Sequence, residues 1–364
     1  MQKFDNQLFI EKESAKEDFQ EIFREYSVKN VFVVGGHTYE HTYIPKMMEE
    51  LGVNVIRFKG YTPNPKYEEV LAGMEMIKAH KCDIVISVGG GSAIDTAKNI
   101  RLFSELPEGE LYFKQEYVKP SIPHIAIPTT AGTGSEANEN SVLYYNGIKQ
   151  SISSKYNIPE YVFFEPEILK GMSEYTRNST LADAIAQSIE SIWAKGSTEE
   201  SSKYAEDGLK LLIDNLDDYL DGDEDAIKCI QKGAFLAGKA IGISKTTAAH
   251  AMSYDLASQY GIAHGHSVAV VLPAVARSIT NRIDEANVDA INTICSILNT
   301  NIDDLYKCIE NILKKINMTA PDYESIDKVK GLVKTVNILR LSNNPIGYTE
   351  EQIEALYLEA FGIN

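Results

Sequence analysis

The sequence predicts an α/β N-terminal domain followed by an all-α C-terminal domain. In the first half of the chain, four short runs rich in β-branched residues alternate with helical patterns. After Pro166 these runs stop, and only segments of helical periodicity follow. The 364 residues, of which 44% are hydrophobic, are also enough for two domains with a core each.

The elements of the first half form a series of strands and crossover helices. Short runs of this composition are typical of strands buried in a parallel sheet. A helix is expected over Pro65–His80, where Val70, Met74 and Ile77 recur at helical spacing. The alternation indicates βαβ units. The expected strands are Asn30–Val34, Val53–Phe58, Asp83–Val88 and His124–Ile127.

The second half consists of helical segments separated by glycine or acidic turns, and Gly261 is expected to end one of these helices. We place the domain boundary near Pro166–Gly171, which gives domains 1–168 and 169–364. Because no Gly/Ser linker separates them, we expect the halves to pack across a shared cleft. The expected helices are Ser179–Ala194, Ser201–Asp218, Asp225–Ile241 and Thr246–Tyr260.

The composition argues against nucleic-acid and membrane partners. The formal net charge is -17, from 52 acidic and 35 basic residues, so polyanionic surfaces would repel the chain. No segment approaches the roughly 20 apolar residues that span a bilayer, and the first residues lack the apolar core of a signal peptide. We therefore expect a cytoplasmic protein whose four cysteines are free thiols.

A glycine-rich turn follows the third expected strand. Bare N–H groups at such a strand-to-helix turn can hold a pyrophosphate at the positive end of a helix dipole. The dinucleotide fingerprint is incomplete, because Ile94 stands at its third glycine position. A tight turn that needs glycine only for its backbone angles is the alternative. The turn reads Gly89-Gly90-Gly91-Ser92-Ala93-Ile94-Asp95.

A second loop of small residues follows the strand His124–Ile127. Its hydroxyls and glycines are expected at the carboxyl edge of the parallel sheet, where α/β folds bind ligands. The alternative is a loop that caps the next helix through Ser135. The loop reads Pro128-Thr129-Thr130-Ala131-Gly132-Thr133-Gly134-Ser135-Glu136.

The second half also offers donors for a metal ion. Asp183, Gln187 and Glu190 fall on one face of an expected helix. A single histidine is more often a core residue, but three that group with a buried-looking aspartate favour a site for Fe²⁺, Zn²⁺, Mn²⁺ or Co²⁺. The three of the seven histidines that lie close in sequence are His250, His264 and His266.

Together these motifs resemble the iron-containing (group III) alcohol dehydrogenases, over nearly the whole chain. The resemblance implies a dinucleotide-binding α/β domain and a helical metal-binding domain, a fold shared with glycerol dehydrogenases and dehydroquinate synthases. The motifs that carry it are Gly89-Gly90-Gly91-Ser92 with Asp95 and Lys98, Pro128-Thr129-Thr130 with Gly132-Thr133-Gly134-Ser135-Glu136, Asp183-Ala184, His250-Ala251-Met252, and His264-Gly265 before Leu272-Pro273.

The resemblance also implies the ligands of each site. Asp183, His250 and His264 would bind a divalent metal, Fe²⁺ or alternatively Zn²⁺, with Gln187 where many relatives have a fourth ligand histidine. The cofactor would be NADPH or NADH. Its expected contacts are Gly36, Gly89, Gly90, Gly91, Ser92, Asp95, Thr129, Thr130, Ser135 and Lys149.

Two departures from the family pattern point to one branch. Gln187 and Tyr254 stand where many relatives have histidine, and with Lys245 they look most like the phosphonoacetaldehyde reductases. An anionic substrate needs a cation near the metal, for which Lys245 is the candidate, although a surface lysine is the alternative. Gly35-Gly36 replaces an acidic residue that would repel the extra phosphate of NADP, so NADPH should be accepted, with His37 as a candidate contact.

The expected reaction is reduction of a short aldehyde, with or without a phosphonate, by hydride from the nicotinamide. Tyr254, His266 or a chain of water molecules would pass a proton to the product oxygen. Two alternatives stay open: a sugar-phosphate cyclase or lyase of the dehydroquinate synthase type, and a non-catalytic nucleotide-binding relative. The expected partner is a small aldehyde or alcohol, with a homodimer left open as the assembly.

Overall fold

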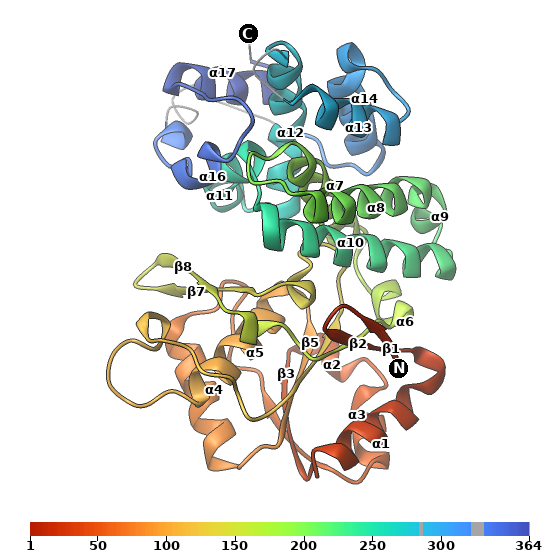
Figure 1. Cartoon of the computed structure of the whole chain (residues 1–364), viewed down its shortest axis with the longest axis vertical. Helices are drawn as coiled ribbons and strands as arrows, with labels where there is room; N and C mark the ends of the chain where they lie inside the picture. Colours follow the sequence, from red (N-terminus) through yellow and green to blue (C-terminus); the bar gives the residue numbers. More distant parts are fainter. Residues whose placement is uncertain (284–286, 322–330, 364) are drawn as a thin grey trace. The chain divides into compact units, whose positions relative to one another are not determined.

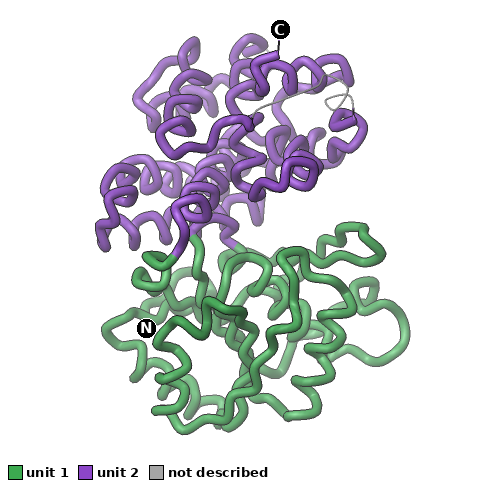
Figure 2. Tube along the Cα trace, turned by 180° about the vertical axis from the view of Figure 1, so that it is seen from behind, with its two compact units in different colours: residues 1–130, 135–171 green, residues 131–134, 172–364 purple. Residues whose placement is uncertain are grey.

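The computed structural model describes residues 1–283, 287–321 and 331–363. Figures 1 and 2 show the chain and its two compact units. Unit 1 comprises residues 1–130 and 135–171, and unit 2 comprises residues 131–134 and 172–364. Unit 1 contains a sheet with helices, and the described elements of unit 2 are helical, so the predicted fold class is confirmed.

A seven-stranded sheet with the order β1-β2-β9-β6-β5-β3-β4 organises unit 1 (Figure 1). Its strand pairs are parallel except for β1 with β2. The four expected strands are present as β3 to β6, each end within one residue of the prediction. The strands are β1 Gln2–Phe4, β2 Gln7–Ile10, β3 Asn30–Gly35, β4 Asn54–Phe58, β5 Ile84–Gly89, β6 His124–Pro128 and β9 Tyr161–Phe163, with a separate antiparallel hairpin of β7 Asn140–Tyr145 and β8 Ile148–Ser153.

Both faces of this sheet are covered by helices. Val31 and Val33 of β3 pack in one apolar cluster, and Phe32 and Val34 pack in a second cluster on the opposite face. Full burial of such a side chain stabilises the fold by about 1.5–3 kcal/mol, which explains why the strands are continuous apolar runs. The first face is covered by α1 Ala15–Glu25, α2 His37–Glu40 and α3 Ile44–Glu50, and the second by α4 Tyr67–Ala79 and α5 Gly91–Ser104.

Unit 2 is built around α7, which packs against α8, α10 and α12. As predicted, Gly261 ends α11, in the left-handed conformation with φ 64°. No helix among the described residues is long and apolar enough to cross a membrane. The remaining helices are α6 Pro166–Lys170 in unit 1, then α7 Glu174–Trp193, α8 Glu199–Asp214, α9 Leu216–Leu220, α10 Glu224–Ser244, α11 Ala248–Tyr260, α12 His264–Thr280, α13 Val288–Ile297, α14 Leu305–Lys315, α16 Ile338–Ser342 and α17 Glu350–Ala360.

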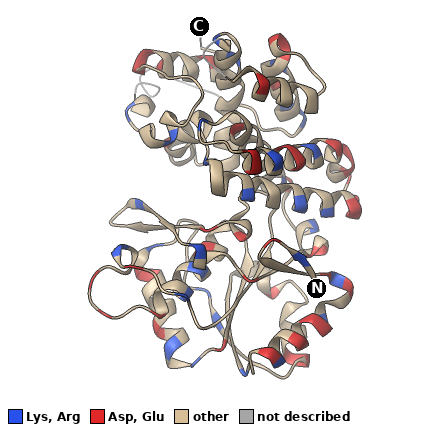
Figure 3. Cartoon of the chain, viewed as in Figure 1, with Lys and Arg blue, Asp and Glu red and all other residues tan. Residues whose placement is uncertain are grey.

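Charged side chains of both signs lie along the outer helices (Figure 3). Buried charges are costly unless they are paired or bind a ligand, so the few exceptions are informative. Among the described residues of unit 2, the buried carboxylates are those of Asp183 and Glu190, which belong to the same helix, α7.

Candidate functional site

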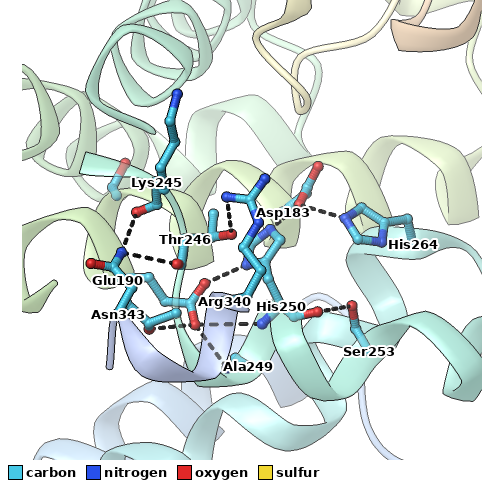
Figure 4. Close-up of polar contacts among 12 residues, drawn as sticks. Asp183, Glu190, Lys245, Thr246, Ala249, His250, Ser253, His264, Arg340 and Asn343 are labelled. Carbon is cyan, nitrogen blue, oxygen red and sulfur yellow. Dashed lines mark hydrogen bonds and ion pairs between the residues drawn. The ribbon is translucent and has the colours of Figure 1, made fainter. Parts of the chain in front are cut away.

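Three side chains from three helices converge in unit 2 (Figure 4). Asp183 of α7, His250 of α11 and His264 of α12 each offer one ligand atom, and these atoms lie within 4.8 Å of one another. His250 Nε2 is 3.3 Å from Asp183 Oδ1, and His264 Nε2 is 3.8 Å from the same oxygen. Asp183 and His250 are buried, whereas His264 is exposed. The cluster is therefore open on the side of His264.

Gly265 explains how α12 can begin so close to α7. A Cβ atom at this position would lie 1.9 Å from the carbonyl oxygen of Ser179 and 2.9 Å from Cβ of Asp183. Only glycine fits such an approach without a shift of one helix. His264, the residue before it, is thereby held against Asp183.

Glu190 positions His250 from the side opposite Asp183. Its Oε2 accepts a short hydrogen bond from His250 Nδ1. Its Oε1 accepts from the Thr247 hydroxyl at 2.7 Å and from the Ala249 backbone N–H at 2.8 Å, so it also caps the start of α11. A carboxylate on one imidazole nitrogen fixes the tautomer and presents the other nitrogen as a ligand.

The cluster brings two buried carboxylates, those of Asp183 and Glu190, close to the histidine rings. Burial alone would raise the pKa of Asp183, but the charge of His264 and the hydrogen bond from His250 lower it. Burial would likewise lower the pKa of His250, but the flanking carboxylates of Glu190 and Asp183 raise it to about 10. The site therefore favours a positive charge strongly.

Gln187 lies one helical turn after Asp183 and completes the donor set. Its amide donates a hydrogen bond to Asp183. Its Oε1 is buried and has no hydrogen-bond partner, an arrangement that costs free energy unless a ligand completes it. Two imidazoles, a carboxylate and an amide oxygen suit a borderline or hard divalent cation. These residues fit the expected metal.

Two other residues that were predicted near the cluster, Tyr254 and His266, lie in different surroundings. The Tyr254 ring stacks on the His264 ring, with 6.2 Å between centroids and 18° between planes, so Tyr254 lies beside the cluster. His266 uses both ring nitrogens elsewhere: Nε2 donates to the Thr319 carbonyl at 2.7 Å, and Nδ1 accepts from the Tyr175 hydroxyl at 3.2 Å. His266 is thus a packing residue outside the cluster in this structure.

Lys245 stands at the sharp junction of α10 and α11. Its φ of 63° is in the left-handed region that favours glycine, and its ammonium donates to the Gly242 carbonyl at 2.7 Å. In Figure 4 the ammonium is drawn apart from the three ligand residues. The structure does not bring Lys245 into the cluster.

In unit 1, the two predicted loops meet at the carboxyl ends of β5 and β6. The Thr129 N–H donates to the Gly89 carbonyl at 3.1 Å. A Cβ at Gly90 would lie 3.2 Å from Thr130 Oγ1, and one at Gly89 would lie 2.5 Å from Cβ of Ala93. Glycine is therefore needed for close packing at Gly89, while Gly90 and Gly91 begin α5 with bare N–H groups.

Several of the polar residues predicted around these loops form hydrogen bonds within the protein. The Ser92 hydroxyl donates a short bond to the Pro63 carbonyl, and that of Ser135 donates to Asp95, whose second oxygen accepts from Val142 N–H at 3.0 Å. Lys149 is exposed on β8, and its charge acts on Asp95. These contacts brace the loops.

Gly36 precedes α2 at the end of β3, beside several basic groups. Arg57 of β4 donates to the Gly36 carbonyl, and both Arg57 and Lys59 form ion pairs with Glu40. The hydrogen bonds from Lys59 and Arg57 lower the pKa of Glu40 to about 2. The candidate ligand atoms of His37, Glu40 and His41 lie within 4.8 Å of one another on this exposed surface.

Three residues of unit 2 acquire roles that the sequence did not assign. Glu190 was placed on the face of Asp183 and Gln187 by helical spacing, and this spacing was the signal of its role. Arg340 and Asn343 of the α16 region contact the segment before His250. No local pattern marks them, because long-range packing brings them there.

Comparison with known proteins identifies the family. A model described as iron-containing alcohol dehydrogenase matches residues 6–166, and one for the C-terminal part of Fe-containing alcohol dehydrogenases matches residues 178–361. The chain is 31% identical to a 1,3-propanediol dehydrogenase of Citrobacter freundii over 265 residues, 71% of this chain and 67% of that protein. It is 29% identical to a phosphonoacetaldehyde reductase of Streptomyces viridochromogenes over 223 residues, 58% of this chain and 56% of that protein.

Solved structures share the fold over the full length. The sulfoacetaldehyde reductase of Bifidobacterium kashiwanohense in complex with NAD⁺ superposes with a TM-score of 0.89 at 24% identity, covering 100% of this chain and 99% of that chain. An iron-containing alcohol dehydrogenase of Thermotoga maritima gives 0.81 at 25% identity, covering 99% of both. The resemblance found in the sequence is confirmed: the chain is an oxidoreductase of the iron-containing alcohol dehydrogenase family.

Proposed function

We propose that this protein reduces a short aldehyde to its alcohol, taking hydride from NADPH or NADH and one proton, with release of NADP⁺ or NAD⁺. The convergence of Asp183, His250 and His264 carries the proposal, and the buried, unpartnered oxygen of Gln187, one helical turn after Asp183, supports it. A divalent cation there, Fe²⁺ or Zn²⁺, would supply Lewis-acid polarisation of the carbonyl, and the nicotinamide would supply the hydride.

The residues of the cluster have separate tasks in this reaction. Asp183 supplies the buried negative charge that retains a cation, and Glu190 keeps the His250 ring oriented with Nε2 toward Asp183. His264, on the exposed side, leaves access for a small molecule. We assign the proton step to the Tyr254 hydroxyl, because its ring lies against His264 whereas His266 has both nitrogens engaged.

For the cofactor we propose that the pyrophosphate binds at the first turn of α5, where Gly90 and Gly91 offer backbone N–H groups. We further propose that NADPH is accepted, because Arg57 contacts Gly36, Lys59 shares the partner Glu40 with Arg57, and these two cations can hold the additional phosphate. Glu40 competes for both cations. Glu40→Gln should therefore raise the ratio of NADPH to NADH efficiency, and an unchanged ratio would exclude this assignment.

Metal analysis with anaerobic ferrous or zinc reconstitution, followed by an aldehyde panel with NADH and NADPH, tests the proposal. The expected result is metal-dependent, stoichiometric consumption of reduced cofactor, lost in Asp183→Ala. A matched control is Asp255→Ala on α11, which removes a partly exposed carboxylate outside the cluster. A sugar-phosphate cyclase would show no net cofactor consumption, and a non-catalytic relative would bind nucleotide without turnover.

A further inference from the structure

Arg340, on the short helix α16, contacts the segment that leads into the helix of His250 (Figure 4). Arg340 donates from Nη1 to the Thr246 hydroxyl at 3.2 Å. A guanidinium has five N–H donors, and this is the one hydrogen bond of its side chain within the described part of the chain. No carboxylate among the described residues forms an ion pair with Arg340, which is half-buried. Within the described part of the chain, most N–H donors of this guanidinium are thus available for a ligand.

Both ends of α16 are fixed to the segment that carries His250. At its start, the Asn337 backbone N–H donates to the Ala251 carbonyl at 3.2 Å. At its end, the Asn343 amide donates to the Ser244 carbonyl at 2.8 Å and to the Thr246 carbonyl at 3.1 Å. The guanidinium is therefore positioned before any ligand arrives, which reduces the entropy lost on binding.

With a divalent cation bound, the two buried carboxylates of the cluster balance its charge, so an anionic substrate group needs a further cation nearby. Asp183 and Glu190 are buried carboxylates, and in Figure 4 the Arg340 guanidinium is drawn between Asp183 and the ammonium of Lys245. Lys245 donates instead to the carbonyl of Gly242 in its own helix. A planar guanidinium also matches the paired oxygens of a sulfonate, phosphonate or carboxylate better than an ammonium does.

We infer that Arg340 binds the anionic end of the substrate, which is then a short aldehyde that carries a sulfonate, phosphonate or carboxylate group. This inference rests on the proposed function, because the carbonyl end is assigned to the cluster. Arg340 is a specificity residue: it selects the anion, while Asp183, His250 and His264 serve the carbonyl.

The first test compares kcat/KM for anionic and neutral aldehydes of similar length. The panel contains sulfoacetaldehyde, phosphonoacetaldehyde, malonic semialdehyde and propanal, which separates the three anions from one another. Loss of a charge-assisted contact should lower the anionic-to-neutral ratio about 10- to 100-fold in Arg340→Ala. Arg340→Lys should recover part of it, and added guanidinium should partly rescue Arg340→Ala.

Two controls separate recognition from structural damage. Arg277→Ala removes an exposed arginine of the same unit, which is ion-paired with Glu359, and should keep the wild-type ratio. Lys245→Ala tests the other cation. A fall in the ratio with Lys245→Ala but not with Arg340→Ala would overturn the inference, as would a wild-type enzyme that prefers propanal.

A binding measurement keeps the inference testable if turnover is absent. Ethanesulfonate has no reducible carbon, and ethyl methyl sulfone is a neutral molecule of similar size. In the metal-loaded protein, ethanesulfonate should raise the unfolding temperature and the sulfone should not, and Arg340→Ala should remove the difference. Failure of every aldehyde with this shift intact would refute the proposed function alone, whereas absence of the shift in the wild type would refute the role of Arg340.

Discussion

Gly265→Ala is the most direct perturbation of the site, because it changes the spacing of α7 and α12 without touching a ligand. The new Cβ would lie 1.9 Å from the Ser179 carbonyl oxygen, which is backbone and cannot rotate away. Ordinary contact requires a shift of at least about 1 Å, and such overpacking costs about 1–3 kcal/mol. Metal–ligand distances tolerate only about 0.2 Å, so the shift should separate His264 from Asp183 beyond what a metal permits.

The assay is thermal unfolding with and without Zn²⁺ or, anaerobically, Fe²⁺. At about 100 times its dissociation constant, a metal stabilises the wild type by about 2.7 kcal/mol, and Gly265→Ala should lose this increment. The matched control is Gly347→Ala, whose new Cβ meets nothing within 4 Å and should keep the increment. Full metal-induced stabilisation in Gly265→Ala would refute the close-approach argument.

Three further predictions concern buried polar groups. Glu190→Gln should weaken metal binding about 10- to 100-fold in chelator competition, because His250 Nδ1 loses its carboxylate acceptor; wild-type affinity would contradict this. Gln187→His should strengthen metal binding about 10-fold by replacing an amide oxygen with an imidazole, and no change would show that Gln187 is not a ligand. Burial raises the pKa of Glu136 to about 7 from an unfolded value of about 4.3, so its contribution to stability is complete below that lower value and is lost as pH rises through 7. Between these two pH values the wild type should lose about 3 kcal/mol of unfolding free energy. In urea titrations at several pH values, Glu136→Gln should lose less unfolding free energy than the wild type. The same pH dependence in both proteins would refute the assignment.

The sequence was most informative where local pattern and burial agree. Strands β3, β5 and β6 are almost entirely buried, and the edge strand β4 still packs apolar residues in both clusters, so a short apolar run was sufficient to find all four. Strands β1 and β2 and the hairpin of β7 and β8 were missed, because part of each is exposed and its composition is mixed. Gln187 and Glu190 could be placed near Asp183 because all three lie on α7 at helical spacing.

Arg340, which we infer to bind the anionic end of the substrate, was harder to find from the sequence, for a reason that concerns the backbone. Lys245 was chosen because it precedes His250 closely in sequence, which assumes that the chain continues smoothly into the ligand helix. Its positive φ instead turns the chain sharply at the end of α10, and no glycine announces the turn.

The same turn is connected to the helix that carries Arg340. A residue in this conformation costs about 1–3 kcal/mol, so surrounding contacts must hold it. The Asn343 amide does so by donating to the carbonyls on either side, those of Ser244 and Thr246. Because Asn343 also ends α16, the contact that stabilises the strained turn is the one that fixes the helix of Arg340. The strained backbone at Lys245 and the position of the Arg340 guanidinium thus depend on the same contacts. An anion bound by Arg340 would therefore be coupled, through these contacts, to the backbone segment that begins the helix of His250.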